Sequence, residues 1–461
     1  MDSTSEHVQL NTNTIIPNDI LNKINISNNS PSKSDSENEN SISNSDITIH
    51  SDSSNSETSD SLISSSTSTE HEEETINFMG DIIGHRYIVL NKIGGGAFSS
   101  VWLSYNIKDD HFYILKIQFS DDYDDGIFEG KVLVRAKHTN IIKIHERFIL
   151  SDDRVCLVLE VLGESLCSLL DHKYDKGLPL NVVKKITKQL LEAVQYIHED
   201  RKIVHTDIKV ENILLQTASP RFEQMKKDFL NTELLNKIKE IQQIKYTGLP
   251  KNRNRREKLI KKKKHEHYAT YKNLVCTTLQ DNNYTSINNM NITHDNCDIK
   301  LADMGTCLEL DDLFSNELQT EYYRAPEIIL GNQFNEKIDI WSVGCVIFEL
   351  LTGNLLFDPK KSKHFSRCKN HLLDIIEIFG HFDKNYIKKC KNKSKFYNHN
   401  NELTNCPEID FTNLSDYLIE YEIDKDISIK TTEFLKHVFA YDINDRHSAK
   451  QLLELDWLQN I

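Results

Sequence analysis

Three short segments rich in β-branched and aromatic residues mark the beginning of the structured part of the chain. They cover residues 87–93, 100–106 and 112–118, and turn-forming residues separate them. Strands favour such side chains because these pack well on a pleated surface. The pattern predicts three consecutive β-strands.

Later in the chain the apolar pattern has a helical period. Between residues 181 and 198 the apolar side chains recur at intervals of three and four, at Val182, Val183, Ile186, Leu190, Val194 and Ile197. That spacing places them on one face of a helix. Residues 338–351 are mostly apolar and predict a central, buried helix. A small sheet-rich part therefore precedes a larger helical part, which is an α+β arrangement.

Residues 1–80 have a different composition. They hold 14 acidic residues against Lys23 and Lys33, a net charge of −12, and almost no aromatic side chains. Such a segment cannot bury enough apolar surface to offset the entropy lost on folding. We expect a disordered tail, either simply solubilising or phosphorylated at serines that an acidic residue follows, which are Ser34, Ser36, Ser45, Ser51, Ser56 and Ser59.

A second change in composition interrupts the chain at about residues 219–296. Residues 221–272 carry sixteen Lys or Arg against six Asp or Glu, and Asn, Thr and Asp dominate the residues that follow. This predicts a basic, low-complexity spacer between two structured elements. Three interpretations stay open: a solvated, disordered insertion, a docking segment for RNA or an acidic partner at residues 253–264, or a nuclear address at residues 261–264.

Composition also limits the class of protein. The 461 residues carry a net charge of −15, and the remainder without tail and spacer carries −13, which suits cationic partners. The longest nearly unbroken apolar run, residues 343–351, is far shorter than the roughly 18 residues of a membrane span. The nine cysteines show no C-x-x-C spacing, and the residues after Met1 are polar and do not resemble a signal peptide. We therefore expect a soluble protein in a reducing compartment.

A glycine-rich turn directly after the first predicted strand is the first candidate for chemistry. Glycines there let backbone N–H groups approach phosphate oxygens, and Lys116 on the third strand could clamp a phosphate. Taken singly, the turn could be an ordinary hairpin and Lys116 an exposed strand-edge lysine. The candidate nucleotide-binding residues of the turn are Ile93, Gly94, Gly95, Gly96, Ala97, Phe98, Ser99, Ser100 and Val101.

Residues 203–215 and 300–305 supply the second group of candidates. Asp207 could accept a proton from an attacking hydroxyl, and Lys209 could neutralise a transferred phosphoryl group. Asn212 and Asp303 carry the oxygen ligands that Mg²⁺ prefers. Each residue is ordinary by itself, but their order and spacing after the glycine-rich turn and Lys116 are specific.

Together these motifs resemble the eukaryotic protein kinases over about residues 87–458. The resemblance implies the two-lobed protein kinase fold, with an N-terminal lobe at about residues 87–162 and a C-terminal lobe at about 163–458. It implies a serine/threonine kinase that binds ATP and Mg²⁺ between the lobes. Asp207 would be the catalytic base with Lys209 beside it, and Asn212 and Asp303 would hold Mg²⁺.

The same resemblance implies further roles. Glu129 would pair with Lys116, although Gly126 and Gly130 weaken the expected helix around it, and Asp125 is the alternative. Glu327 and Arg446 would form a buried ion pair. At the hinge and adenine pocket, the contacts with ATP would come from Glu160, Leu162 and Leu214, with Leu159 behind them.

Within this group the sequence is most similar to the SR-protein kinases, which belong to the CMGC group and phosphorylate arginine/serine-rich proteins. The loop at residues 94–103, Glu-Val-Leu-Gly at 160–163, His-Thr-Asp-Ile-Lys at 205–209 and the long spacer carry this similarity. Thr206 replaces an arginine that binds an activating phosphate in other kinases. We therefore expect an activation segment that is ordered constitutively, although Thr206 could also be a neutral replacement.

The substrate groove departs from that pattern. Glu377 matches one of the acidic residues of the family, but Asn370 replaces another, and lysines of the wrong sign for an arginine-rich chain stand nearby, at Lys360, Lys361, Lys363 and Lys369. A basic or Arg/Ser-rich protein substrate remains compatible with the acidic body. Specificity for Arg/Ser repeats is left open.

The resemblance also sets expectations about the protein's surroundings. We expect a monomer without membrane association in the cytoplasm or nucleus of a eukaryotic cell, which would be a host cell if a virus encodes the protein. The alternative to an active enzyme is an inactive scaffold. Such scaffolds generally lose a phosphate lysine, catalytic aspartate or metal ligand, whereas Lys116, Asp207, Asn212 and Asp303 are all present.

Overall fold

The structure is a computed structural model that describes residues 76–96, 98–150, 152–243, 247–279, 291–311, 318–361 and 365–459. Residues 76–78 belong to a separate unit, and the described residues of the main body begin at Met79. The expected tail thus lies mostly outside the described residues. Its last residues, Met79 and Gly80, belong to the body, where the Gly80 N–H donates to the carbonyl of Val89 at 2.8 Å.

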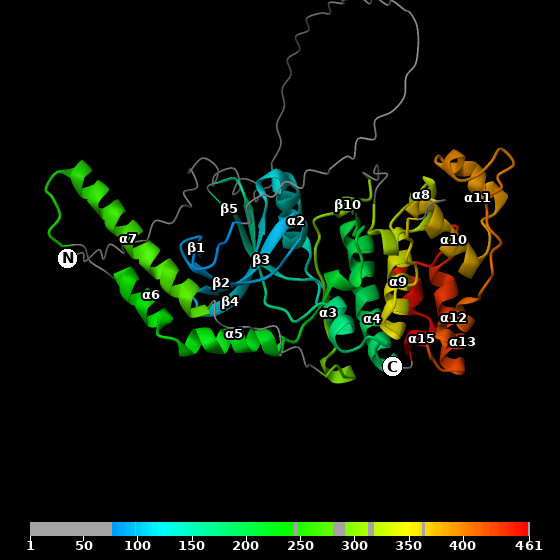
Figure 1. Ribbon diagram of the computed structural model, residues 1–461, viewed down its shortest axis with the longest axis horizontal. Helices are drawn as coiled ribbons and strands as arrows, with labels where there is room; N and C mark the ends of the chain where they lie inside the picture. Colours follow the sequence, from blue (N-terminus) through cyan, green and yellow to red (C-terminus); the bar gives the residue numbers. More distant parts are fainter. Residues whose placement is uncertain are drawn as a thin grey trace, which may run out of the picture. The chain divides into compact units, whose positions relative to one another are not determined.

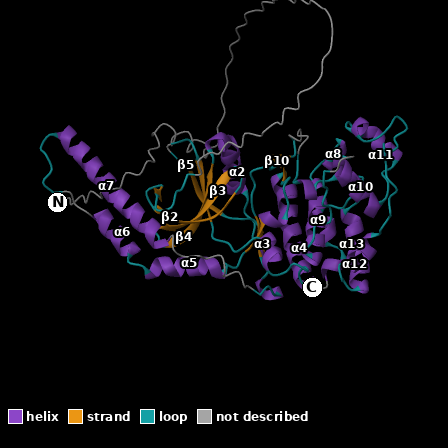
Figure 2. Ribbon diagram, viewed as in Figure 1, coloured by secondary structure: helices purple, strands orange, loops and turns teal. Residues whose placement is uncertain are grey.

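An antiparallel sheet of six strands forms the N-terminal lobe (Figures 1 and 2). Along the sheet the strands follow the order β1-β2-β3-β4-β6-β5. Strands β2, β3 and β4 are the three predicted ones, each longer by one or two residues than expected. The bounds are β1 (Ile82–Ile83), β2 (Tyr87–Gly95), β3 (Ser99–Asn106), β4 (His111–Gln118), β5 (Ile144–Ile149) and β6 (Val155–Leu159), and helix α2 (Tyr123–Arg135) packs against β5 and β6.

Helices dominate the C-terminal lobe. The predicted apolar stripe lies on α4 (Leu180–Tyr196), where all its members within the helix are buried. The predicted central helix is α9 (Ile338–Thr352), every residue of which is buried. The other helices of the lobe are α3 (Leu166–His172), α8 (Pro326–Leu330), α10 (Arg367–Phe379), α11 (Lys384–Lys389), α12 (Leu414–Glu420), α13 (Lys425–Val438), α14 (Ala449–Leu453) and α15 (Asp456–Gln459).

Two small antiparallel ladders position the loops that carry chemistry. Strand β7 (Ile203–Val204) pairs with β10 (Leu308–Glu309), and β8 (Ile213–Leu215) pairs with β9 (Ile299–Leu301). The loop between β7 and β8 contains Asp207 and Asn212, and the loop between β9 and β10 contains Asp303. The ladders therefore hold both loops at the same edge of the C-terminal lobe.

Most of the spacer is helical, with α5 (Pro220–Asn231), α6 (Leu234–Gln243) and α7 (Arg253–Leu279) between β8 and β9. Phe229 of α5 is fully buried, with its ring 5.0 Å from that of Tyr105 on β3. Lys272 of α7 makes a 2.7 Å ion pair with Asp81. The interpretation as a solvated, disordered insertion is wrong for these residues, because apolar side chains on each helix are buried against the N-terminal lobe or a neighbouring helix.

No helix among the described residues combines the length and the apolar character needed to cross a lipid bilayer.

Candidate active site

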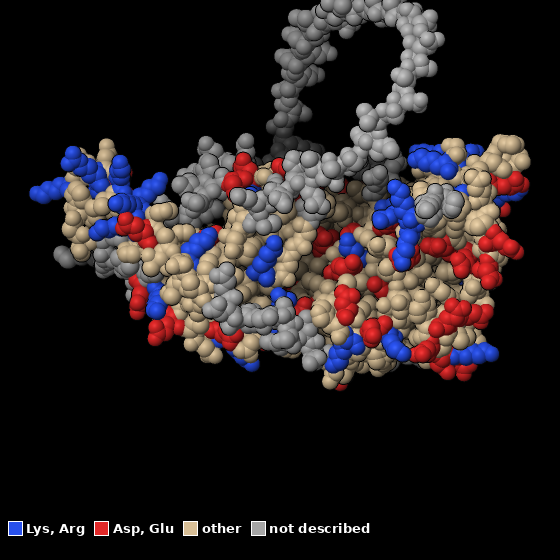
Figure 3. All heavy atoms as spheres, in the orientation of Figure 1, with Lys and Arg blue, Asp and Glu red and all other residues tan. Residues whose placement is uncertain are grey.

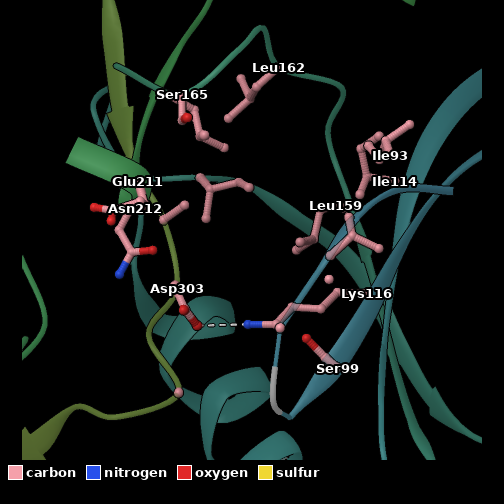
Figure 4. A pocket seen from close by; sticks show the side chains of 18 of the residues that line it. Ile93, Ser99, Ile114, Lys116, Leu159, Leu162, Ser165, Glu211, Asn212 and Asp303 are labelled. Carbon is pink, nitrogen blue, oxygen red and sulfur yellow. Dashed lines mark hydrogen bonds and ion pairs between the residues drawn. The ribbon is translucent and has the colours of Figure 1, made fainter. Parts of the chain in front are cut away.

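A cavity of about 630 Å³ is lined by residues of both lobes (Figure 4). Its walls come from the turn between β2 and β3, from β4, from α2 and from the loops after β7 and β9. The sequence-predicted residues that line it are Ile93, Gly94, Gly95, Gly96, Phe98, Ser99, Val101, Lys116, Glu129, Glu160, Leu162, Asp207, Lys209, Asn212, Leu214 and Asp303.

Two predicted nucleotide-binding residues do not join this set. Ser100 is buried and its Oγ accepts a 2.9 Å hydrogen bond from the indole of Trp102. Because side chains alternate along a strand, Ser100 points to the face of β3 opposite Ser99 and Val101. Ser100 therefore does not line the cavity, although it was predicted to bind the nucleotide. Ala97 lies outside the described residues.

Lys116 joins two carboxylates inside the cavity. Its Nζ lies 2.8 Å from Oε1 of Glu129 on α2. It also lies 2.7 Å from Oδ1 of Asp303, the contact drawn as a dashed line in Figure 4. Gln118, two residues along β4, donates a 2.9 Å hydrogen bond to the other oxygen of Glu129. Glu129, and not the alternative Asp125, is thus the partner of Lys116.

The three charges shift one another's protonation. Burial opposes the charged form of Lys116, but Glu129 and Asp303 outweigh it and raise the pKa of the ammonium. Burial raises the pKa of Glu129, and the Lys116 charge only partly offsets this. For Asp303, the attraction of Lys116 outweighs burial and lowers the pKa. The cavity therefore keeps a cationic Lys116 and an ionised Asp303 at neutral pH.

Two glycines allow α2 to approach the sheet closely enough for this pairing. A Cβ on Gly126 would lie 2.7 Å from Cγ of Gln118 and 2.8 Å from Cβ of Val155. A Cβ on Gly130 would lie 3.1 Å from Leu157. We expected these glycines to weaken the helix, but α2 is continuous across them. The absence of a side chain at both positions lets the strands pack closely against α2.

Asp207 is the centre of a second cluster. Its Oδ2 lies 2.7 Å from Nζ of Lys209, and the amide of Asn212 donates to Oδ2 at 3.1 Å and to the Asp207 carbonyl at 2.9 Å. Thr320 donates a 2.6 Å hydrogen bond to Oδ1 and accepts one of 3.0 Å from Lys209. Each oxygen of the Asp207 carboxylate is thereby held in place.

A buried aspartate of α9 holds the backbone before Asp207. Oδ2 of Asp339 accepts hydrogen bonds from the His205 N–H at 2.7 Å and from His198 Nε2 at 2.8 Å, and Oδ1 accepts one from the Thr206 N–H at 2.9 Å. Thr206 adopts a left-handed φ of 67°. That conformation is unfavourable for a β-branched residue, and the hydrogen bonds that the backbone N–H groups donate to Asp339 stabilise it.

Asn212 and Asp303 also fit a divalent cation. Because the amide nitrogen of Asn212 binds Asp207, its oxygen is left for other partners, and in Figure 4 both side chains lie on the same wall of the cavity. Carboxylate and amide oxygens are the ligands that Mg²⁺ prefers, usually with phosphate oxygens completing the set. Among the described residues, no cluster of three or more His, Cys, Asp or Glu provides a self-sufficient metal site.

The other end of the cavity is an apolar slot beside the hinge. Its walls are formed by Val101, Ile114, Leu159, Leu162 and Leu214. The carboxylate of Glu160 accepts from the Lys143 N–H at 2.7 Å and pairs with Lys300 at 2.8 Å. The Glu160 carboxylate is therefore engaged with Lys143 and Lys300 and is not directed at a flat ring lying in the slot.

Sequence reasoning missed Thr320 and Phe222. Thr320 is 113 residues from Asp207, and only its position just before the Ala-Pro-Glu motif could have indicated it. Phe222 on α5 lines the cavity near the hinge, although it belongs to the spacer. The N-capped turn Ser219-Pro220, which starts a helix at the beginning of the spacer, was the available signal.

Comparison with known proteins agrees with this geometry. The protein kinase domain family matches residues 87–247 and 283–458, and the gap contains all of α7. Protein kinase dsk1 of Schizosaccharomyces pombe is 27% identical, with 83% of this chain and 82% of the relative covered. Serine/threonine-protein kinase SRPK of Physarum polycephalum is 30% identical, with 83% and 88% covered. SRSF protein kinase 3 of Mus musculus is 25% identical, with 82% and 87% covered.

The geometry of the cavity and the similarities to known proteins have one common explanation. The cavity holds Lys116 between two carboxylates, and Asp207 lies in the same cavity, held by hydrogen bonds. The chain belongs to the protein kinase family, and it is a serine/threonine-protein kinase close to the SR-protein kinases.

Proposed function

We propose that this kinase binds ATP with Mg²⁺ in the cavity and phosphorylates Ser or Thr hydroxyls of basic proteins. The observation that carries the proposal is the position of Lys116, whose Nζ lies within 2.8 Å of Glu129 and 2.7 Å of Asp303 in the cavity that also contains Asp207. A cation at that place suits phosphate oxygens, and the apolar slot suits the adenine ring.

Asp207 is the proposed base. A substrate hydroxyl within hydrogen-bond reach gives its proton to the carboxylate while its oxygen forms a bond to the γ-phosphorus, and the bond from that phosphorus to the bridging oxygen of ADP breaks. Lys209, 2.7 Å from Asp207, would stabilise the negative charge on the transferred group. Asn212 and Asp303 would hold Mg²⁺, which when bound neutralises charge on the phosphates.

Basic substrates are favoured by a group of acids close to the active site, of which Glu349 is buried and Glu211 and Asp171 are exposed. Burial, followed by the charges of Glu211 and Asp171, raises the pKa of Glu349 to about 7. Glu211 also lines the active-site cavity. A guanidinium placed among these carboxylates would relieve their repulsion and be bound by them.

Helix α10 supports the same preference at a second place. Burial and the neighbouring Glu377 and Asp358 raise the pKa of Asp374 to about 6. Two of the lysines that we counted against a basic substrate are engaged elsewhere. Lys369 is buried and donates to the carbonyl of Thr404, and Lys360 pairs with Asp358 at 2.9 Å. The name SRSF protein kinase 3 of a relative agrees with arginine/serine-rich substrates, which we propose here as well.

Activity without activating phosphorylation is a further part of the proposal. Oγ1 of Thr206 donates a 2.7 Å hydrogen bond to the carbonyl of Thr306, just after Asp303. This bond links the catalytic loop to the start of the activation segment without a phosphate. Residues 312–317 of that segment lie outside the described residues.

An ATP assay on an arginine/serine-repeat peptide tests the proposal. We expect Asp207→Asn to lower kcat by several orders of magnitude while nucleotide binding persists. Equal activity of the two proteins would exclude the proposed base. Replacing the arginines of the peptide with alanine should raise KM, and Glu211→Gln should reduce that difference. Equal use of both peptides by the wild type would exclude the substrate class but not the kinase activity.

A further inference from the structure

Helix α7 has two halves with different surroundings. The buried residues of its C-terminal half are Tyr271, Val275 and Leu279, and the Lys272–Asp81 ion pair fixes this half to the start of the N-terminal lobe. None of the residues 253–264 is buried. The helix is therefore anchored at one end, and its other end extends into solvent.

The extended half carries a concentrated positive charge. Residues 253–264, which we call the basic arm, contain eight Lys or Arg and one acid, Glu257, a net charge of +7 on a chain whose total is −15. Figure 3 shows these side chains as a group of blue atoms at the outer end of α7, the left end of that view. The charge is therefore segregated from the acidic body.

Acids on the same helix lie beside some of these cations. Arg253 pairs with Glu257 at 2.9 Å and Lys262 with Glu266 at 3.7 Å, and both pairs are exposed. Lysines three and four positions apart on a helix, such as Lys258 with Lys261 and Lys262, repel one another. A polyanion bound along the arm would remove this repulsion.

The chemistry of the arm selects among polyanions. An acidic protein surface would be expected to need an apolar or aromatic anchor, and the arm exposes neither, since Leu259 and Ile260 are half-buried. An anionic membrane would need an apolar face, and single-stranded nucleic acid would need aromatic rings for stacking. A duplex backbone needs only cations, and the roughly 18 Å length of twelve helical residues faces about ten of its phosphates.

We propose that the basic arm of α7 binds the phosphate backbone of double-stranded nucleic acid. RNA and DNA duplexes both present this phosphate backbone. Comparing the affinities for the two duplexes identifies which of them the arm binds. None of the basic-arm residues lines the active-site cavity, so the arm would place the kinase on its nucleic acid without changing the catalytic step.

Fluorescence anisotropy of the full-length protein with 20-bp RNA and DNA duplexes, between 50 and 200 mM KCl, tests the proposal. The key variant replaces four exposed cations of the basic arm, Arg255→Gln, Arg256→Gln, Lys258→Gln and Lys261→Gln. Removing up to four phosphate contacts should lower the slope of log K against log salt by up to about 3.6 and weaken binding at least tenfold. Activity on a peptide should stay within twofold of the wild type.

A matched control removes the same charge elsewhere, at four exposed lysines of α11 and the residues after it, Lys388→Gln, Lys389→Gln, Lys391→Gln and Lys395→Gln. Duplex affinity should then change less than twofold. Equal weakening by the control would show a nonspecific charge effect and overturn the proposal. So would wild-type protein that binds polyglutamate or phosphatidylserine vesicles more tightly than either duplex at 100 mM KCl.

Discussion

Thr320 and Asp207, 113 residues apart in sequence, are joined by a 2.6 Å hydrogen bond from Oγ1 of Thr320 to Oδ1 of Asp207. The same oxygen of Thr320 accepts a 3.0 Å hydrogen bond from Lys209, which itself pairs with Asp207. The three side chains form a closed ring. Thr320 thus orients the carboxylate of Asp207, the proposed base, directly.

Replacing Thr320 with valine should separate these effects. The isopropyl side chain of valine has nearly the shape of threonine and keeps the packing, but the carboxylate of Asp207 loses a donor and Lys209 loses an acceptor. We expect kcat to fall about 10- to 100-fold, since misplacing a reactive group costs rate of this order. KM for ATP should stay within twofold in steady-state assays. Serine at this position should restore most of the rate, and failure to do so would contradict the role of the hydroxyl.

The space around the Cβ position predicts opposite effects on stability for alanine at two glycines, Gly126 and Gly96. Gly126→Ala should destabilise the protein by about 1–3 kcal/mol, because its Cβ would lie 2.8 Å from the strand residue Val155. Kinase activity should fall with it as Glu129 moves away from Lys116. Gly96→Ala has open space around its Cβ and should leave the urea midpoint unchanged while raising KM for ATP. A Gly126→Ala protein of wild-type stability would contradict the packing argument.

The free energy of unfolding depends on pH through the buried carboxyl group of Glu349. Its folded-state pKa of about 7 exceeds the ordinary value of 4.5, so between these values the unfolded chain releases the proton and the folded chain retains it. Stability is therefore lost as pH rises from 4.5 to 7. Glu349→Gln, which keeps an acceptor for Tyr323, should gain about 2–3 kcal/mol relative to the wild type between pH 5 and pH 8. A difference that does not change with pH would refute this shift.

The ion pair of Glu327 and Arg446 is fully buried, with N–O distances of 2.6 and 3.0 Å, as the family resemblance implied. Removing only the cation, by Arg446→Met, should cost about 3–5 kcal/mol of unfolding free energy because a buried charge remains without a partner. The double variant with Glu327→Gln should be more stable than Arg446→Met alone. Urea unfolding of the single and double variants measures this coupling.

Phosphatase treatment checks the proposed constitutive activity. Because Thr206 links the catalytic loop to Thr306 by a hydrogen bond, we expect activity within twofold of untreated protein. Thr206→Val, which lacks that donor, should lower kcat after the same treatment. Loss of wild-type activity on dephosphorylation would show that a phosphate orders the segment.

Local patterns were sufficient for the regular elements of the body. Strands β2 to β4 and helices α4 and α9 lie where the apolar periodicity placed them, since each depends on which face of one segment is buried. The spacer was the main error. Helices α5 to α7 lie in a segment whose charge and composition predicted a low-complexity spacer, and they are stabilised by contacts such as that of Phe229 with Tyr105, which no local pattern contains.

The motif spacing was informative about which residues could share a site, but not about how they meet. It indicated Lys116 and Asp303, and it left Glu129 and Asp125 as alternatives for the partner. The choice depended on how closely α2 approaches the sheet across Gly126 and Gly130, which is a property of packing between elements.

The amino-acid order alone was enough to predict strands β2 to β4 and helices α4 and α9, and to indicate which polar residues could share a site, because periodicity and motif spacing are properties of short stretches. The convergence of Thr320 with Asp207, the face on which Ser100 is buried and the anchoring of α7 required the folded molecule. Each depends on contacts between residues distant in sequence, and only the packing of whole elements against one another determines such contacts.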